Sequence, residues 1–206
     1  MASIYGLKPK FQALLRPIVR ALARSGVTAN QVTVAAVALS LAVGAAIFLV
    51  GDRRILLLLP LALVMRMALN AIDGMLAREH GQASKLGALL NEAGDVASDA
   101  LMYLPLMARP EFPSVVVLML VVFGFLIETV GMAAVQFGAS RRYDGPFGKS
   151  DRAFAFGALA LLLGLGVPGG VWLRLMFVVM AGLAVATLIQ RTIRALKEAA
   201  PSEPYS

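Results

Sequence analysis

The sequence has no cysteine, a single histidine and few charged residues, which make up 15% of the chain. Without cysteine neither a disulfide nor a thiolate metal site can form, so thiol chemistry does not indicate the cellular compartment. The single histidine, His80, also argues against a zinc or copper site, because those metals favour thiolate and imidazole ligands. The shortage of charge is unlike a soluble domain, where about a quarter of the residues are charged.

Most of the chain is apolar. Hydrophobic residues fill 59% of its 206 positions, and the mean hydropathy is +0.80. A helical span needs roughly 20 apolar residues to cross a hydrocarbon core about 30 Å thick, so the chain has room for about six spans and for no large soluble domain. We predict an all-α integral membrane protein with six transmembrane helices, at residues 31–50, 55–77, 87–107, 113–137, 153–167 and 171–188.

The segment ahead of the first span mixes apolar and basic residues over 8–24, the pattern of an amphipathic helix that lies on a membrane face. Its basic residues are spread out instead of preceding a compact apolar core, so we expect no cleaved signal peptide. The predicted organisation is an interfacial segment at 1–27, a six-helix transmembrane domain at 28–197 and a disordered polar tail at 198–206.

The net charge of +7 suits basic loops against an anionic lipid surface. Nucleic acid is not an expected partner, because no basic tract is interleaved with aromatic residues. With six spans, most lysines and arginines fall on the same side as the N-terminus, and positive residues accumulate in cytoplasmic loops. We expect a bacterial inner (plasma) membrane protein with both termini in the cytoplasm.

Two predicted spans carry polar stripes that are costly in a bilayer, where a carboxylate costs roughly 2.5 to 3.5 kcal/mol and usually marks function. At 3.6 residues per turn, each stripe falls on one helix face. The first stripe comprises Arg66, Asn70, Asp73 and Ala77, and the second comprises Asn91, Glu92, Asp95 and Asp99. Antiparallel neighbours would bring these faces together, and converging oxygen ligands suit a hard cation such as Mg²⁺ or Mn²⁺.

The spacing of these residues resembles the signature of the CDP-alcohol phosphotransferases, D-x-x-D-G-x-x-A-R, eight residues, G-x-x-x-D-x-x-x-D. The match runs from Asn70 to Asp95 and departs from the pattern at two positions, where Asn70 and Asn91 replace the first and third aspartates. The run 28–33, Thr-Ala-Asn-Gln-Val-Thr, also resembles the family's T-P-N-x-x-T before the first span, with Ala29 in place of proline.

The resemblance implies an enzyme of phospholipid biosynthesis that moves a substituted phosphate from a CDP-alcohol, with CDP-diacylglycerol the expected donor, to an acceptor hydroxyl and releases CMP. By position, Asp73 would bind metal, Arg78 would pair with phosphate, and Asp95 would be the base that takes the acceptor's proton. Small side chains that leave room for the cytidine would be Gly74, Ala77 and Gly87.

The resemblance also implies Mg²⁺ or Mn²⁺ as cofactor, as two ions. Asn70 and Asn91 can ligate through their amide oxygens but bring no charge, so we expect Glu92 and Asp99 to restore the missing negative charge beside Asp95. A one-metal variant and an inactive variant are the alternatives.

A second basic cluster lies between the fourth and fifth predicted spans. The resemblance makes Arg141, Lys149 and Arg152 candidates for binding a phosphate on the acceptor, although cytoplasmic loops are ordinarily basic. Arg66 could counterbalance the acids of its own stripe or pair with Glu128. A homodimer is the expected assembly, and Gly124 and Gly131, which could seat a second subunit, are better explained by packing within one bundle.

Two other functions stay open. Intramembrane acids also build cation or proton pathways, but the chain shows no internal repeat of the kind that transporters often carry. A protein that binds a CDP-lipid without turning it over is the second alternative.

Overall fold

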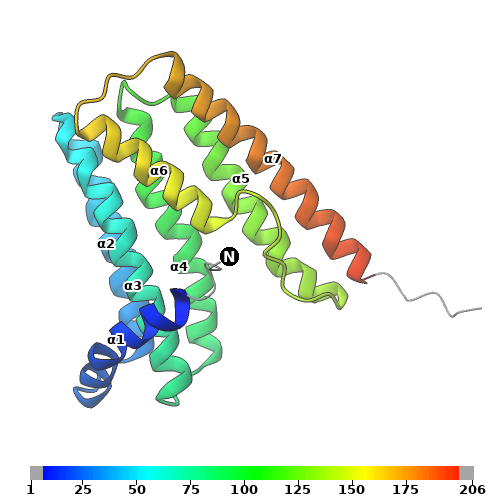
Figure 1. The fold of residues 1–206 in the computed structure, drawn as a ribbon. Coiled ribbons are helices and arrows are strands. Elements are labelled where there is room, and N and C mark those ends of the chain that lie inside the picture. Colours follow the sequence, from blue (N-terminus) through cyan, green and yellow to red (C-terminus); the bar gives the residue numbers. More distant parts are fainter. Residues whose placement is uncertain (1–6, 200–206) are drawn as a thin grey trace, which may run out of the picture. The chain divides into compact units, whose positions relative to one another are not determined.

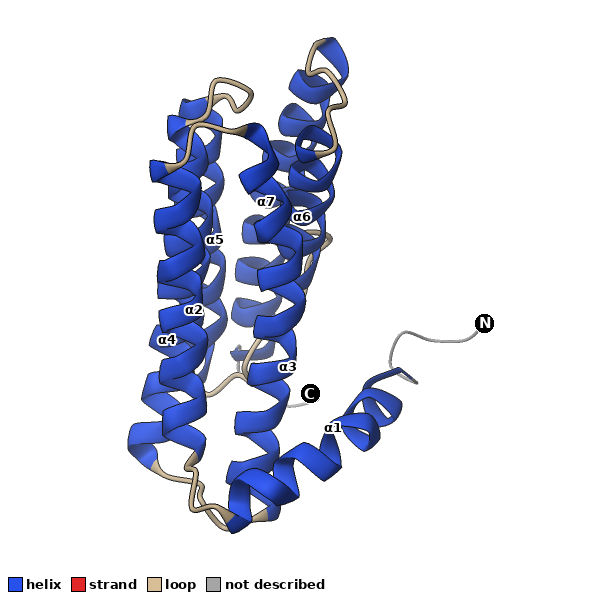
Figure 2. Ribbon diagram, turned by 90° about the vertical axis from the view of Figure 1, so that its left-hand side faces the viewer, coloured by secondary structure: helices blue, strands red, loops and turns tan. Residues whose placement is uncertain are grey.

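The computed structural model describes residues 7–199, and all the regular structure in that range is helical (Figures 1 and 2). The α-helices are α1 (Leu7–Arg24), α2 (Ala29–Leu49), α3 (Leu58–Glu79), α4 (Lys85–Tyr103), α5 (Ser114–Ala133), α6 (Lys149–Gly164) and α7 (Val171–Ala199). Short 3₁₀ turns adjoin three of them: η2 (Arg53–Leu57) precedes α3, η3 (Leu104–Ala108) follows α4 and η4 (Ala134–Phe137) follows α5. Each of the six predicted spans coincides with one helix from α2 to α7.

Four helical stretches in the described range are long and apolar enough to cross a membrane: Ala29–Leu49, Arg53–Glu79, Ser114–Phe137 and Val171–Ala199. The chain is therefore a membrane protein with these candidate spans. Helices α4 and α6 fall outside that set. Ionisable side chains recur along α4, and α6 has only 16 residues.

By their internal contacts the described residues form two compact units. The first comprises residues 7–46 and Leu61–Met102, and the second comprises Ile47–Pro60 and residues 103–199. In the first unit, α1 runs obliquely to α2 and α3 (Figure 2). Its Leu15 and Val19 are buried in a cluster with α2 and α3 residues, whereas Leu14 and Ile18 are exposed. The predicted amphipathic helix is thus present, with one apolar edge packed and another uncovered.

The chain between α1 and α2 turns sharply because both helix ends are capped. Gly26 has φ +79°, a left-handed conformation that suits glycine after a helix, and the Val27 amide donates back to the Leu22 carbonyl. Thr28 and Gln31 form a capping box: the Gln31 amide donates to the Thr28 hydroxyl oxygen, and the Thr28 amide donates to the Gln31 side chain. The run 28–33, which resembles the family's T-P-N-x-x-T pattern, therefore sets where α2 begins.

In the second unit, three buried aromatic residues from α4, α6 and α7 pack together. Tyr103 stacks on Phe156 with ring centroids 4.3 Å apart, and Phe156 meets Phe177 edge-on at 6.3 Å. Buried Arg109 ties η3 to the start of this unit, since its guanidinium donates to the carbonyls of Val50 and Gly51.

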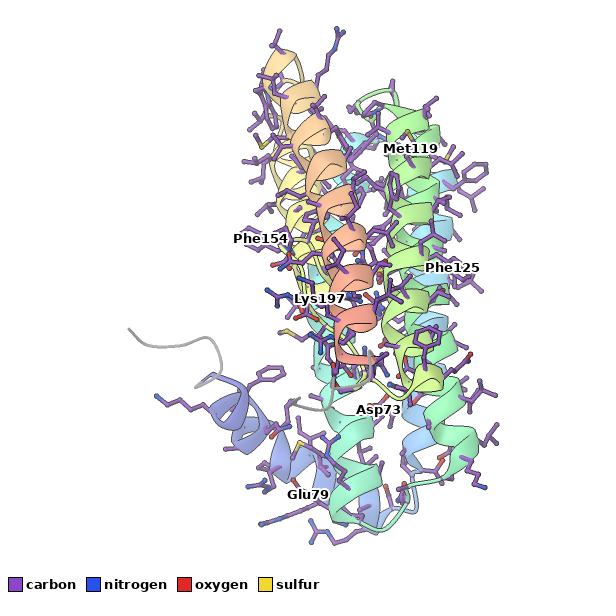
Figure 3. All side chains as sticks on the ribbon, turned by 90° about the vertical axis from the view of Figure 1, so that its right-hand side faces the viewer. Asp73, Glu79, Met119, Phe125, Phe154 and Lys197 are labelled. Atoms are coloured by element: carbon purple, nitrogen blue, oxygen red, sulfur yellow. The ribbon has the colours of Figure 1, made fainter. Side chains whose placement is uncertain are left out.

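Apolar side chains cover the outer faces of the spans. Met119, Phe125 and Phe154 project from their helices and are exposed, as expected where lipid is the solvent (Figure 3). At the other end of the sequence, α7 continues through Ala199, so the first two residues of the expected tail, Glu198 and Ala199, are helical. Residues 200–206 lie outside the described residues.

Candidate active site

Asp73 lies on α3 with only 5% of its surface exposed. The hydroxyl of Thr33, on α2, donates to Asp73 Oδ2 at 2.9 Å. A hydrogen bond of this kind fixes the orientation of the carboxylate. Thr33 belongs to the Thr28–Thr33 run, so that run both begins α2 and orients the acid that the resemblance assigns to metal binding.

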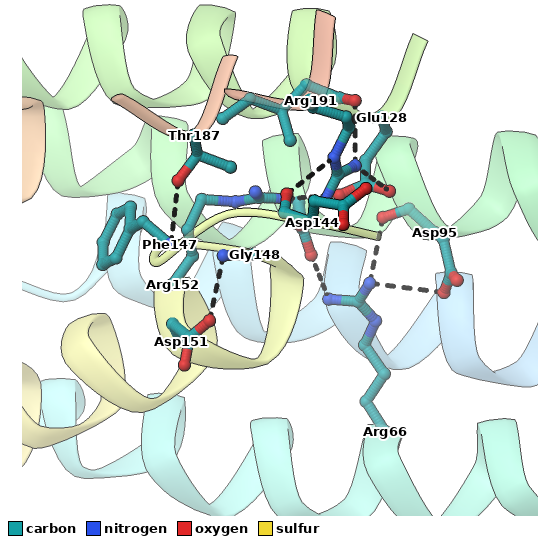
Figure 4. A network of polar contacts seen from close by, with 12 residues as sticks. Arg66, Asp95, Glu128, Asp144, Phe147, Gly148, Asp151, Arg152, Thr187 and Arg191 are labelled. Atoms are coloured by element: carbon teal, nitrogen blue, oxygen red, sulfur yellow. Dashed lines mark hydrogen bonds and ion pairs between the residues drawn. The ribbon is translucent and has the colours of Figure 1, made fainter. Parts of the chain in front are cut away.

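Asp95 lies on α4 and accepts hydrogen bonds from two side chains of α3. The Asn70 amide donates from Nδ2 to Asp95 Oδ1 at 2.8 Å, and Arg66 Nη2 lies 3.5 Å from the same oxygen. Arg66 Nη2 also donates to the Asp95 backbone carbonyl at 2.9 Å (Figure 4). Its Nη1 donates to Asp99 Oδ1 at 2.6 Å. The two predicted polar stripes do meet, and Arg66 pairs with the acids of its own unit. The alternative partner, Glu128, pairs elsewhere.

Two of the predicted small residues make room for protein side chains. A Cβ on Gly74 would come within 3.1 Å of Arg78 Nη2, so glycine lets that guanidinium fold back over α3. A Cβ on Gly87 would come within 2.8 Å of Asn30 Oδ1, so glycine allows the start of α4 to approach the start of α2. Ala77 packs against the core shared by α1, α2 and α3.

The donor set of α3 and α4 is chemically suited to a hard cation, because it consists of carboxylate and amide oxygens. Asp73 is held by Thr33, and Asn91 and Glu92 are half-buried on α4. Across the described range, no group of three Asp, Glu, His or Cys side chains is placed to hold one ion. A Mg²⁺ or Mn²⁺ ion here would complete its coordination with amide oxygens, water or substrate phosphate, as Mg²⁺ usually does.

A second polar centre, which we call the loop cluster, lies in the second unit, where the loop before α6 meets α7. Asp144 accepts from Arg142 Nε at 2.7 Å and from Arg194 Nη1 at 2.6 Å. Arg142 also pairs with Glu198, whose carboxylate in turn accepts from the Ser140 amide and hydroxyl at 3.0 Å each. Burial raises the pKa of Asp144, but the hydrogen bonds from the two arginines outweigh it and leave that pKa below its ordinary 3.8.

Deeper in the same unit, two almost fully buried arginines share one carboxylate. Glu128 Oε1 lies 3.5 Å from Arg152 Nη2, and Glu128 Oε2 lies 3.6 Å from Arg191 Nη1. Arg191 also donates to the carbonyls of Asp144 and Ile127 (Figure 4). The centre as a whole has a surplus of positive charge, because four arginines face three carboxylates.

The three predicted acceptor-binding cations all lie in this second unit. Arg141 stacks over the ring of Tyr143, with 5.0 Å from its guanidinium carbon to the ring centroid, and Lys149 begins α6. Arg152 is buried beside Glu128. Glycine gives it space, since a Cβ on Gly124 would come within 3.1 Å of Arg152 Nε.

Several residues of these two centres were not assigned to a site from the sequence. Thr33 lies within a run that we singled out, but its partner is 40 positions away. The only sequence signal for the other three residues is a charged side chain next to an apolar segment, which applies to Glu128, Asp144 and Arg191. Packing within the chain explains the glycine at position 131, because a Cβ there would come within 2.6 Å of the Arg142 carbonyl oxygen.

An all-helical membrane protein with facing acidic stripes on α3 and α4 is the class that the fold and the site define. Within it, the chain belongs to the CDP-alcohol phosphatidyltransferase family, which it matches over residues 26–191. The resemblance drawn from Asn70 to Asp95 is thereby confirmed, and the family consists of transferases of phospholipid biosynthesis.

Among full-length relatives, the chain is 44% identical over 189 residues to the inner membrane protein YnbA of Escherichia coli, covering 92% of this chain and 94% of that protein. Two solved structures of Mycobacterium tuberculosis phosphatidylinositol phosphate synthase, PgsA1, share the fold. The complex with manganese and citrate has a TM-score of 0.76 at 22% identity and covers 92% of each chain. The complex with CDP-DAG has a TM-score of 0.70 at 24% identity and covers 91% of this chain and 94% of that one.

Proposed function

We propose that this protein transfers a phosphatidyl group from a CDP-alcohol, with CDP-diacylglycerol as donor, to an acceptor alcohol and releases CMP. The acceptor oxygen would form a bond to the lipid-side phosphorus, the bond from that phosphorus to the CMP oxygen would break, and the hydroxyl proton would pass to Asp95. The observation that carries the proposal is the contact of Asp95 with Asn70 and Arg66, which holds a carboxylate at the family's last aspartate position.

The other residues of the first unit take up the donor. Arg78 is exposed and folds over Gly74, so its guanidinium can pair with diphosphate oxygens. Asp73, Asn70, Asn91, Glu92 and Asp99 are the further candidates for holding metal. A Mg²⁺ or Mn²⁺ ion bound there would polarise the diphosphate and stabilise the departing CMP. The PgsA1 complex with manganese supports this choice of ion.

Binding of a phosphate on the acceptor is proposed for Arg141, Lys149 and Arg152. The surplus positive charge of the second unit supports an acceptor that is itself phosphorylated. The identity of the alcohol depends on the shape of its pocket, and comparison of candidate alcohols in one assay would reveal it.

The proposal includes six membrane crossings, with α4 and α6 joining the four apolar spans. It places the protein in a bacterial inner membrane with both termini and the active site in the cytoplasm, as a homodimer. The relative named as an inner membrane protein supports the membrane assignment. Cysteine accessibility at engineered loop positions tests the orientation, and light scattering in detergent tests the dimer.

The deciding experiment is incubation of the purified protein with CDP-diacylglycerol, Mg²⁺ or Mn²⁺ and a panel of alcohols. We expect CMP release that requires one of the alcohols, is abolished by chelation of the metal, and falls at least 100-fold in Asp95→Asn. Asp52→Asn is the matched control, since Asp52 caps η2 in the second unit. CDP-lipid binding without CMP under any condition would instead identify a binding protein, and ion flux in vesicles would identify a transporter.

A further inference from the structure

Three arginines of α1, at positions 16, 20 and 24, are spaced one helical turn apart. Residues four apart on a helix are neighbours, so these guanidinium groups share one side of α1, where like charges repel. The first is neutralised, because Arg16 Nε and Nη2 donate to the two carboxylate oxygens of Glu79 at 3.3 and 3.0 Å. Within residues 7–199, the exposed side chains of Arg20 and Arg24 form no ion pair, so two positive charges remain uncompensated by these residues.

Arg20 and Arg24 line a pocket of about 580 Å³. Sites for small ligands typically measure roughly 300 to 1,000 Å³, so the pocket is large enough for one. Its other lining residues are Pro17, Ala23 and His80. The imidazole ring carries an N–H donor whether it is neutral or charged. The pocket therefore offers two guanidinium groups and an imidazole, with no carboxylate among its lining residues.

Both walls of the pocket are held by contacts within the first unit. On one side, buried Leu15 and Val19 fasten α1 to the cluster that it shares with α2 and α3. On the other side, His80 follows the end of α3 and precedes Gln82, whose side-chain oxygen accepts from the Ala29 amide at 2.6 Å. Because these contacts exist without a ligand, little of the binding energy would be spent on ordering the site.

The pocket is separate from the candidate active site. None of the residues proposed to bind the donor or the metal lines it. Ile72 and Leu76 of α3 pack in the cluster with the buried residues of α1, whereas Asp73 accepts a hydrogen bond from α2. A ligand in the pocket would thus contact the α1 side of the first unit and leave the acidic stripes free.

We propose that this pocket binds a phosphate group through Arg20, Arg24 and His80. A phosphate group is anionic and presents several strong acceptor oxygens, and the planar fork of a guanidinium matches phosphate in a bidentate manner. Two sources supply such a group: the headgroup of an anionic lipid, which an amphipathic helix at the membrane surface can reach, and free phosphate in water. The proposal concerns binding alone and does not depend on the proposed transfer reaction.

His80 makes the pocket directly observable, because the chain contains no other histidine. Protein with isotope-labelled histidine is titrated in a neutral detergent with inorganic phosphate, at constant pH and followed by nuclear magnetic resonance. Sodium chloride at equal ionic strength is the control. A second arm compares nanodiscs of phosphatidylcholine with and without phosphatidylglycerol, in the absence of free phosphate.

We expect a saturable shift of the imidazole resonances in at least one arm and none with chloride. A shift with inorganic phosphate identifies free phosphate as a ligand, and a shift with phosphatidylglycerol identifies the lipid headgroup. No shift in either arm, or an equal shift with chloride, would overturn the proposal.

A pair of double variants tests the two arginines. Arg20→Gln with Arg24→Gln removes both guanidinium groups, and we expect the affinity to fall at least about 10-fold, because each charge-assisted hydrogen bond contributes substantially to binding. The matched control, Arg53→Gln with Arg54→Gln, removes the same charge from two exposed arginines of the second unit and should bind like the parent. Equal affinities in the two double variants would overturn the assignment to Arg20 and Arg24. If the first does not fold, the titrations of the parent protein decide alone.

Discussion

The Thr33 hydroxyl on α2 donates to the buried carboxylate of Asp73 on α3 at 2.9 Å. This contact links the residues that begin the first span to the acid at the centre of the family signature. Because this hydroxyl contributes to the orientation of the acid, its removal should disturb the site more than the fold.

Thr33→Val keeps the shape of the side chain and removes the hydroxyl. Loss of an orienting hydrogen bond to a metal-binding group typically reduces metal affinity or activity by about 10- to 100-fold, and we expect a loss in that range for Mn²⁺ affinity. Titration with Mn²⁺ measures it. Ser40→Ala is the matched control, because the Ser40 hydroxyl is buried on the same helix and donates only to the Ala36 carbonyl among the bonds seen. Equal affinities in the two variants would contradict an orienting role.

Glu128→Gln tests the buried carboxylate shared by Arg152 and Arg191. Removing one partner from a buried ion pair leaves charge uncompensated and costs about 3 kcal/mol. We therefore expect a clear fall in the midpoint of thermal unfolding in detergent. The control is Glu79→Gln, which breaks an exposed pair with Arg16 and should change stability little. If the two variants unfold at the same temperature, Glu128 does not stabilise the second unit.

Gly145→Ala tests the loop before α6. Gly145 has φ +118°, and a Cβ there would come within 2.3 Å of Thr187 Cγ2. We expect destabilisation of about 1 to 3 kcal/mol from backbone strain and displacement of the loop, measured by thermal unfolding. Gly182→Ala is the opposite case. Nothing lies within 4 Å of its Cβ position, so alanine in α7 should be neutral or slightly stabilising.

Acid should loosen the loop cluster through Asp144. Burial raises the pKa of Asp144, yet Arg142 and Arg194 bring it below 3.8, so the folded pKa is lower than the unfolded one. The stabilisation is then complete well above pH 3.8 and is lost as the pH falls through the folded value. Hydrogen–deuterium exchange of residues 138–148, corrected for intrinsic rates, should rise in that acidic range only. In Asp144→Asn we expect fast exchange already at neutral pH, and unchanged protection there would contradict the prediction.

The sequence predicted the helices well, because polar or glycine-bearing turns such as Gly26 and the run 80–84 separate them. It also placed Asp73 and Asp95 on facing stripes, since the helical period fixes which residues share a face. The partner of Arg66 could not be read from the sequence. Asp99 and Glu128 are both acids in predicted spans, and only the packing of α3 on α4 selects Asp99.

The count of six spans stays a prediction, because only four helical stretches of the described range qualify by length and composition and α4 is not among them. A charged helix such as α4 looks unsuited to a bilayer when its side chains are counted singly. The structure pairs one of those charges, Asp99, with Arg66 on α3, so the folded helix is less polar than its composition indicates.

The pairing of Arg66 with Asp99 has a consequence for biogenesis. The two charges neutralise each other only once α3 and α4 have packed together. During synthesis each helix therefore carries an unpaired charge that it does not have in the folded protein. The turn at 80–84 is short, and it keeps the two helices close from the moment α4 emerges. If α4 crosses the membrane as proposed, the α3–α4 hairpin would be the unit of insertion, and the site would be assembled in the same event that brings its acids into the bilayer.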